Sequence, residues 1–196
     1  MAAYDSTYLY SRYVRPVLAF DADLPSFAVI GRNFARVSEA GDEIPWAREE
    51  DDGTPWRELV DLQTADESTQ TRYRVECGET DSVTDGQRRL FDWLLANQDH
   101  VVDEIKPAVI DLFNETLKWR AGHFPQDRVL FPADATDEEK LDRFVIRHFA
   151  LDPTGERLLI ELDSLDGWYD EHGCSIVLRN GRLTKWGSWD DIDDDA

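Results

Sequence analysis

Residues 167–187 read GWYDEHGCSIVLRNGRLTKWG, and this stretch decides the fold that we expect. Its second half predicts a β-hairpin, because Asn180-Gly181 stands between two runs that alternate apolar and polar residues. Asn-Gly supplies the two residues of positive φ that a type I′ turn requires, and the tight turn fixes the register. The apolar side chains that would then face the core are Cys174, Ile176, Leu178, Leu183 and Trp186.

Strand-like segments also occur on both sides of a helical middle. They are rich in β-branched and aromatic residues and cover residues 7–20, 26–38, 70–78, 143–151 and 157–162. Pro16 requires an edge position, a bulge or a break in the first segment, and Gly31 indicates a bend in the second. The linker 21–25 between these two segments predicts a turn.

Two capping boxes predict where helices begin. Thr84-Asp85-Gly86-Gln87 has Thr at the N-cap and Gln at N3, and Thr136 to Glu139 repeats the pattern before a short helix to about Arg143. After the first box, apolar residues at helical spacing continue to about residue 119.

The long helical segment contains residues that predict where a helix breaks or ends. Asn97-Gln98-Asp99 predicts a break, and Gly122 predicts the end. Pro107 predicts either a kink or a new helix beginning there, because proline has no N–H and clashes with the preceding turn.

The order of these elements indicates the fold class. Strands flank a run of helices instead of alternating with them, which favours an α+β fold: antiparallel strands from both chain ends packed on two or three central helices. One domain over residues 1–196 is expected. Its parts would be a β-rich region 1–78 with an acidic loop 39–69, central helices 84–120, hairpins 143–187 and an acidic tail 190–196.

The charge of the chain limits its partners. Asp and Glu number 42 against 21 Lys and Arg, which gives a net charge of −21. Nucleic acids and anionic membranes bind through cationic side chains, so neither is expected as a partner. A basic protein partner fits the charge, and so does adaptation of the surface to salty surroundings. The oligomeric state stays open.

Residues 1–20 contain no uninterrupted apolar region of a signal peptide, and no stretch has the length of a membrane helix. We therefore expect a cytoplasmic protein. Its two cysteines, Cys77 and Cys174, share no C-x-x-C pattern, so reduced, buried thiols are expected and a disulfide between them stays open.

Acidic and aromatic residues gather just before the hairpin. Carboxylates could serve as oxygen ligands of a hard cation, and the candidates are Asp163, Asp166 and Asp170. Their spacing matches neither a calcium loop nor a zinc motif, and we expect no cofactor.

The same turn offers an alternative in catalysis. His172 beside Glu171 could act as a general base with Asp170, and Trp168 and Tyr169 could contact a ligand. A nucleophile motif is missing, so a structural role for the turn is the competing interpretation. The other histidines, His100, His123 and His148, stand isolated in the sequence and are interpreted as ordinary.

Two motifs resemble a family of uncharacterised bacterial proteins, a domain of unknown function sometimes found beside polymorphic-toxin loci. One is the T-x-x-Q helix opening at Thr84–Gln87 with the helices after it. The other is W-x-[DE]-E-H-G at Trp168–Gly173 with its hairpin; Cys174 departs from the Leu or Ile common there. The resemblance covers residues 84–120 and 157–187. It implies a bacterial α+β protein with no established catalysis and an immunity role in some relatives, and it assigns no catalytic residues.

The sequence thus predicts a non-enzymatic binding protein with an acidic surface, in one form an immunity-type partner of a basic protein. An enzyme or a metal-binding protein that uses Asp170, Glu171 and His172 is the alternative.

Overall fold

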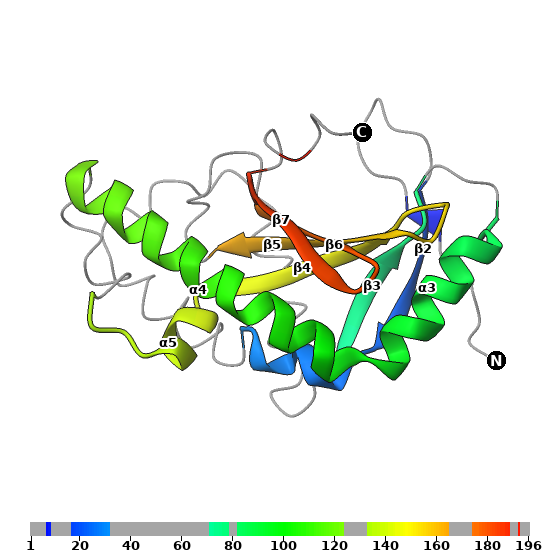
Figure 1. Ribbon diagram of the computed structural model, residues 1–196, viewed down its shortest axis with the longest axis horizontal. Helices are drawn as coiled ribbons and strands as arrows, with labels where there is room; N and C mark the ends of the chain where they lie inside the picture. The colour runs from blue at the N-terminus through cyan, green and yellow to red at the C-terminus, as the bar shows by residue number, and fades with distance from the viewer. Residues whose placement is uncertain are drawn as a thin grey trace.

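The computed structural model describes residues 7–8, 17–31, 71–78, 82–123, 133–164, 174–188 and 192. Within them the α+β fold is confirmed: one mostly antiparallel sheet carries helices against one of its faces (Figure 1). None of the described helices is both long and apolar enough to cross a membrane.

The sheet runs in sequence order from β1 to β7. Its strands are β1 Thr7–Tyr8, β2 Val17–Asp23, β3 Arg72–Glu76, β4 Phe144–Leu151, β5 Arg157–Ser164, β6 Cys174–Arg179 and β7 Arg182–Ser188. Every neighbouring pair is antiparallel except β3 and β4, which are parallel. Our expectation of an antiparallel sheet is therefore wrong at this one pair.

The helices explain the parallel pair. After the 3-10 helix η1 (Pro25–Val29), α3 (Asp85–Ala96), α4 (Gln98–His123) and α5 (Asp137–Leu141) all lie between β3 and β4 in the chain. Parallel strands need a long crossover connection, and this helical run supplies it. In Figure 1, α3 and α4 follow one another along the sheet, and α5 lies beside α4.

One apolar core joins the inner face of the sheet to the helices. Phe149 and Ile160 of the sheet, and Ile105 and Val109 of α4, are all completely buried in it. Phe27 of η1 packs edge-on against Phe149, with ring centroids 4.8 Å apart. Burial of this apolar surface is the main force that holds the helices on the sheet.

Both predicted capping boxes are confirmed. In the first, the Gln87 N–H donates to Thr84 Oγ1 over 3.1 Å and the Thr84 N–H donates to Gln87 Oε1 over 2.9 Å. In the second, Thr136 and Glu139 exchange the same two bonds. The predicted break is confirmed too, since α3 ends at Ala96 and α4 begins at Gln98.

The predicted hairpin is confirmed, with Asn180 and Gly181 at φ of 50° and 75°. The register shifts between Val177 and Leu178, and the Thr184 hydroxyl donates to the Val177 carbonyl over 3.1 Å. This bulge explains why Leu183 and Trp186, three residues apart, both pack against the core.

The prediction of a strand over 26–38 is wrong in its described part, because Pro25–Val29 forms η1. The predicted turn at 21–25 is also displaced, since β2 continues to Asp23. Pairing with β3 extends the strand: Asp23 lies opposite Arg72, and the Leu24 N–H donates to the Thr71 carbonyl. The strand that pairs with β2 is thus β3, about 50 residues further along the chain. Residues near β2 in the sequence could not indicate this pairing.

Pro107 neither begins a helix nor ends one, and α4 runs through it to His123, one residue past Gly122. Pro107 is exposed, while Ile105 and Val109 on either side of it are buried in the core. Packing of both halves of α4 on one core therefore outweighs the hydrogen bond that proline cannot donate.

Both cysteines are buried thiols that form no disulfide, as expected. Cys77 is completely buried after β3, and Cys174 opens β6 in the core. Burial raises the pKa of Cys77 to about 11 and that of Cys174 to about 12. Both thiols are therefore protonated and unreactive at neutral pH.

Candidate functional site

The predicted site lies mostly outside the described residues. Asp166 and residues 168–173 fall between the end of β5 and the start of β6, so the predicted turn and the predictions for Trp168, Tyr169, Asp170, Glu171 and His172 stay predictions. Asp163 is described in β5, and its carboxylate lies 3.9 Å from Nε of Arg147. Burial raises the pKa of Asp163, while the charge of Arg147 lowers it.

Metal binding gains no support from the part of the chain that the structure describes. There, no three His, Cys, Asp or Glu side chains gather closely enough to hold an ion.

Three titratable side chains meet on the sheet face turned away from the helices. His148 of β4 lies between Glu76 of β3 and Glu161 of β5, with 3.6 Å from Nε2 to Glu76 Oε2 and 3.5 Å from Nδ1 to Glu161 Oε2. Their side chains are only 12 to 19% exposed. We call these three residues the His148 cluster.

Burial controls the charge of the His148 cluster. It lowers the pKa of His148 to about 3, and the positive charges of Arg147 and Arg74 act in the same direction. Burial also raises the pKa of Glu76, against the pull of the same two arginines. The lowered pKa favours a neutral imidazole at physiological pH, and a neutral imidazole has one N–H, so it can donate to only one of the two carboxylates.

Our interpretation of His148 as an isolated histidine is wrong, and a β-bulge explains the error. Strict alternation along β4 would place His148 on the same face as Phe144 and Ile146. The register instead shifts between Ile146 and His148, which turns His148 outward and Phe149 into the core. The sequence did hold a signal for this bulge: Phe149 is apolar, although strict alternation from Ile146 would place it on the opposite, outer face.

Exposed carboxylates line the outer side of α4. Those at 99, 103, 111 and 115 are separated by multiples of four residues, so they stay within one half of the helix circumference, over about 24 Å. Lys106 lies 3.9 Å from Asp103. We call the four residues the α4 stripe: Asp99, Asp103, Asp111 and Glu115.

A neighbouring side of α4 holds the hairpin. Glu104 accepts a hydrogen bond from the Leu183 N–H and pairs with Arg182 over 2.6 Å. The Leu183 N–H and then Arg182 lower the pKa of Glu104. His100 Nε2 lies 3.1 Å from the Gly181 carbonyl. The core and the hairpin together fix the orientation of α4, and with it the α4 stripe.

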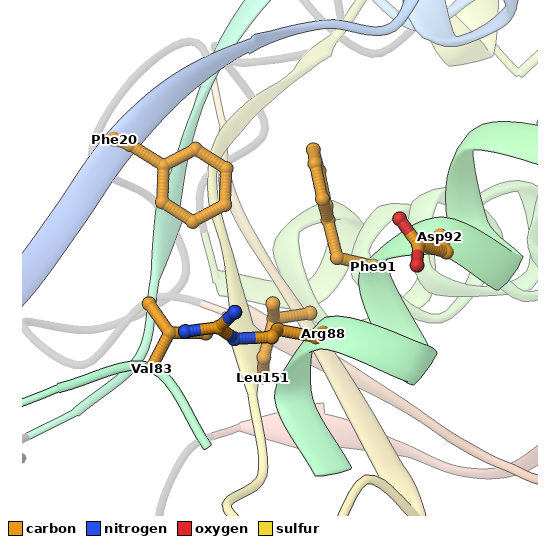
Figure 2. Close-up of a pocket in the computed structure, with 6 residues that line it drawn as sticks. All are labelled: Phe20, Val83, Arg88, Phe91, Asp92 and Leu151. Carbon is orange, nitrogen blue, oxygen red and sulfur yellow. The ribbon is translucent and has the colours of Figure 1, made fainter. Parts of the chain in front are cut away.

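The described surface includes two small hollows. Figure 2 shows the first, about 130 Å³, where Phe20 of β2 faces Phe91 of α3 above Arg88. Its remaining lining is Val83, Asp92 and Leu151. The second, about 110 Å³, is lined by Arg157, Val177, Arg179, Thr184, Lys185 and Ile192. Sites for drug-sized molecules usually measure about 300 to 1,000 Å³, so neither hollow suits one.

Comparison with known proteins gives a family without an assigned activity. No curated protein and no solved structure matches the chain. The match is to a family over residues 47–193, which includes α3 to α5, β3 to β7 and residues 168–173. The chain therefore belongs to the family described as a domain of unknown function, DUF6985.

Proposed function

We propose that this chain is a non-enzymatic binding protein that takes a basic protein partner on the α4 stripe. The observation that carries the proposal is the alignment of four exposed carboxylates on a helix that the core and the hairpin hold in place. The net charge of −21 adds an attractive field for a cationic partner.

The α4 stripe has a local cost. Like charges four residues apart destabilise a helix by about 0.2 to 0.5 kcal/mol per pair, and Asp99 with Asp103 and Asp111 with Glu115 are two such pairs. Lys106 offsets only part of this repulsion, since its ammonium lies 3.9 Å from Asp103. A basic partner would neutralise the whole row.

The length of the α4 stripe favours a protein over a small cation. Its span of about 24 Å exceeds the screening length of about 8 Å at physiological salt, so the outer carboxylates act on different parts of a partner. Complementary charge of this kind speeds encounter more than it raises affinity.

The specific form of the proposal is an immunity protein of the bacterial cytoplasm that blocks a basic toxin. The resemblance of Thr84–Gln87 and Trp168–Gly173 to proteins beside toxin loci supports it. The acidic balance supports neither nucleic acid nor an anionic membrane as the partner.

Two variants that each replace four carboxylates by neutral amides separate the effect of the α4 stripe from a nonspecific effect of net charge. One variant removes the α4 stripe (D99N/D103N/D111N/E115Q). The matched control removes four exposed carboxylates elsewhere (D23N/D92N/D134N/E156Q). A nona-arginine peptide is the probe, and calorimetry at 0.15 M salt measures its Kd.

We expect the stripe variant to bind the peptide about tenfold more weakly than the control variant. Equal losses in the two variants would contradict the proposal, because they would show that acidity is spread without a preferred surface. The immunity form is tested separately: it predicts a basic toxin gene beside the gene of this chain, and co-expression of this chain should restore growth of cells that express that toxin. The absence of such a gene, or growth that stays arrested, contradicts that form.

A further inference from the structure

The second hollow is cationic, which is unusual on a chain of net charge −21. It takes one basic side chain from each of three neighbouring strands: Arg157 from β5, Arg179 from β6 and Lys185 from β7. Val177 and Ile192, both 4% exposed, form its apolar floor. We call it the cationic hollow.

The sheet register brings these charges together. Arg157 lies directly opposite Arg179 in the β5–β6 ladder, and Lys185 lies opposite Val177, two residues before Arg179 on the same face. Like charges directly opposite one another destabilise a sheet. The arrangement therefore works against folding in the absence of a counter-charge.

Among the described residues, acidic side chains do not balance the two arginines. Within the described residues, neither Arg157 nor Arg179 forms an ion pair, and none of the residues that line the hollow is acidic. The two guanidinium groups beside about 110 Å³ suit a small ligand with more than one negative charge and several acceptor oxygens.

We propose that the cationic hollow binds a phosphoryl dianion, as inorganic phosphate or as the end of a small phosphomonoester. The planar forks of Arg157 and Arg179 would each contact two phosphoryl oxygens, and Lys185 would only add positive charge to the surroundings. A carboxylate brings a single charge and leaves the site under-neutralised. A nucleotide is larger than the hollow, so only its phosphoryl end would enter.

This site is independent of the α4 stripe. It has the opposite charge, and Val177 places it on the sheet face turned away from the core, whereas α4 covers the inner face. The net negative charge of the chain opposes the approach of an anion, but salt at 0.15 M screens charges beyond about 8 Å. Binding is therefore to be measured at that ionic strength.

The test uses the full chain with two probes, sodium phosphate and glycerol 3-phosphate, against sodium chloride and sodium acetate at equal ionic strength. Calorimetry gives Kd, and thermal melting gives an independent readout through linkage. We expect the two phosphorylated probes to raise Tm and the other salts to leave it unchanged. Phosphate binding without glycerol phosphate binding assigns the hollow to the free ion, and the reverse assigns it to the ester.

The variant R157Q/R179Q should lower phosphate affinity at least about tenfold, since each substitution removes charge-assisted hydrogen bonds. It should fold, because it removes a repulsion. The matched control is R72Q/R89Q, which removes two exposed arginines from β3 and α3 and should keep phosphate affinity within about twofold.

Three results would overturn the inference. One is binding of neither phosphate nor glycerol 3-phosphate to the native chain; aspartates flank Ile192 in the sequence, and a chain carboxylate would then be the competing anion. Another is an equal loss of phosphate affinity in R157Q/R179Q and R72Q/R89Q, which would show that phosphate binding depends only on the net charge of the chain. The third is acetate binding as tight as phosphate binding, which would exclude selectivity for a dianion.

Discussion

The side-chain amide of Gln87 donates to the carbonyls of both Cys77 and Leu151, over 2.8 and 2.9 Å. The Cys77 carbonyl comes directly after β3, and the Leu151 carbonyl belongs to the last residue of β4. These two strands are the parallel pair of the sheet. Gln87 is completely buried, and its Oε1 also closes the capping box of α3. One residue thus joins the start of α3 to the only parallel ladder among the described strands.

Replacing Gln87 by Leu should lower the free energy of unfolding by about 3 kcal/mol, because two buried carbonyls lose their donor and α3 loses its cap. Urea denaturation measures the loss. Gln98→Leu is the control, since the Gln98 side chain makes only 3.3 Å bonds at a partly exposed site and should cost less than about 1 kcal/mol. An equal loss of unfolding free energy in the two variants would contradict a special role of Gln87 in holding the parallel pair.

Gly86→Ala should destabilise the chain although alanine is the better helix former. Alanine gains about 1 kcal/mol of helix propensity. The added Cβ would lie 2.5 Å from the Pro153 carbonyl oxygen, because the turn Asp152–Gly155 rests on the start of α3. We expect a net loss of about 2 kcal/mol, since overpacking against backbone outweighs propensity.

Gly78→Ala is the comparison for Gly86→Ala. Gly78 has φ of +73° but no atom within 4 Å of an added Cβ, so only backbone strain of about 1 kcal/mol is expected. Thermal melting of both variants orders the two effects. A smaller loss for Gly86→Ala than for Gly78→Ala would mean that the turn does not press on α3.

The His148 cluster predicts a pH dependence of stability with a definite sign. The pKa of His148 is lowered from 6.5 to about 3 in the folded chain. Between these values the unfolded chain binds more protons at this group, so its contribution to stability is lost as pH falls below 6.5. The raised pKa of Glu76 acts oppositely, and its contribution is lost as pH rises above its ordinary value of 4.5.

His148→Asn should therefore flatten the rise of stability between pH 4.5 and 6.5, measured by urea denaturation at several pH values. His100→Asn, at an exposed position on α4 outside the His148 cluster, is the comparison variant that separates the loss of any histidine from the loss of His148. The slope also depends on Arg74, Arg147 and Glu161, which face His148 and stay unchanged in both variants. An unaltered slope in His148→Asn would place the pH dependence elsewhere.

The metal alternative has a simple test. If Asp163, Asp166 and Asp170 do not form an ion site, then calcium, magnesium and zinc should leave Tm unchanged beyond the effect of ionic strength. We expect this result. A rise of a few degrees that disappears in the variant D166N/D170N would instead establish the site that the sequence suggested.

Signals confined to a few residues predicted the structure well. The boxes at Thr84 and Thr136 and the Asn180-Gly181 turn depend on neighbours within four residues, so each was visible in the sequence. The same applies to the strand faces around the hairpin, since its turn sets their register.

Features that depend on distant partners were not predictable. η1 replaced a strand because β2 pairs with β3 instead, and Pro107 stays in α4 because both halves pack on one core. The His148 cluster needs three strands in register and one bulge. The Arg157–Arg179 pair likewise appears only when β5 and β6 are aligned.

The most direct test of the proposed function is an amide chemical-shift titration of the full chain with nona-arginine. We predict that the largest shifts fall on residues 99–115 of α4, and that they vanish in D99N/D103N/D111N/E115Q but persist in D23N/D92N/D134N/E156Q. Shifts of equal size at Asp23, Asp134 and Glu156 would show that the peptide follows net charge alone, and would contradict a binding surface on α4.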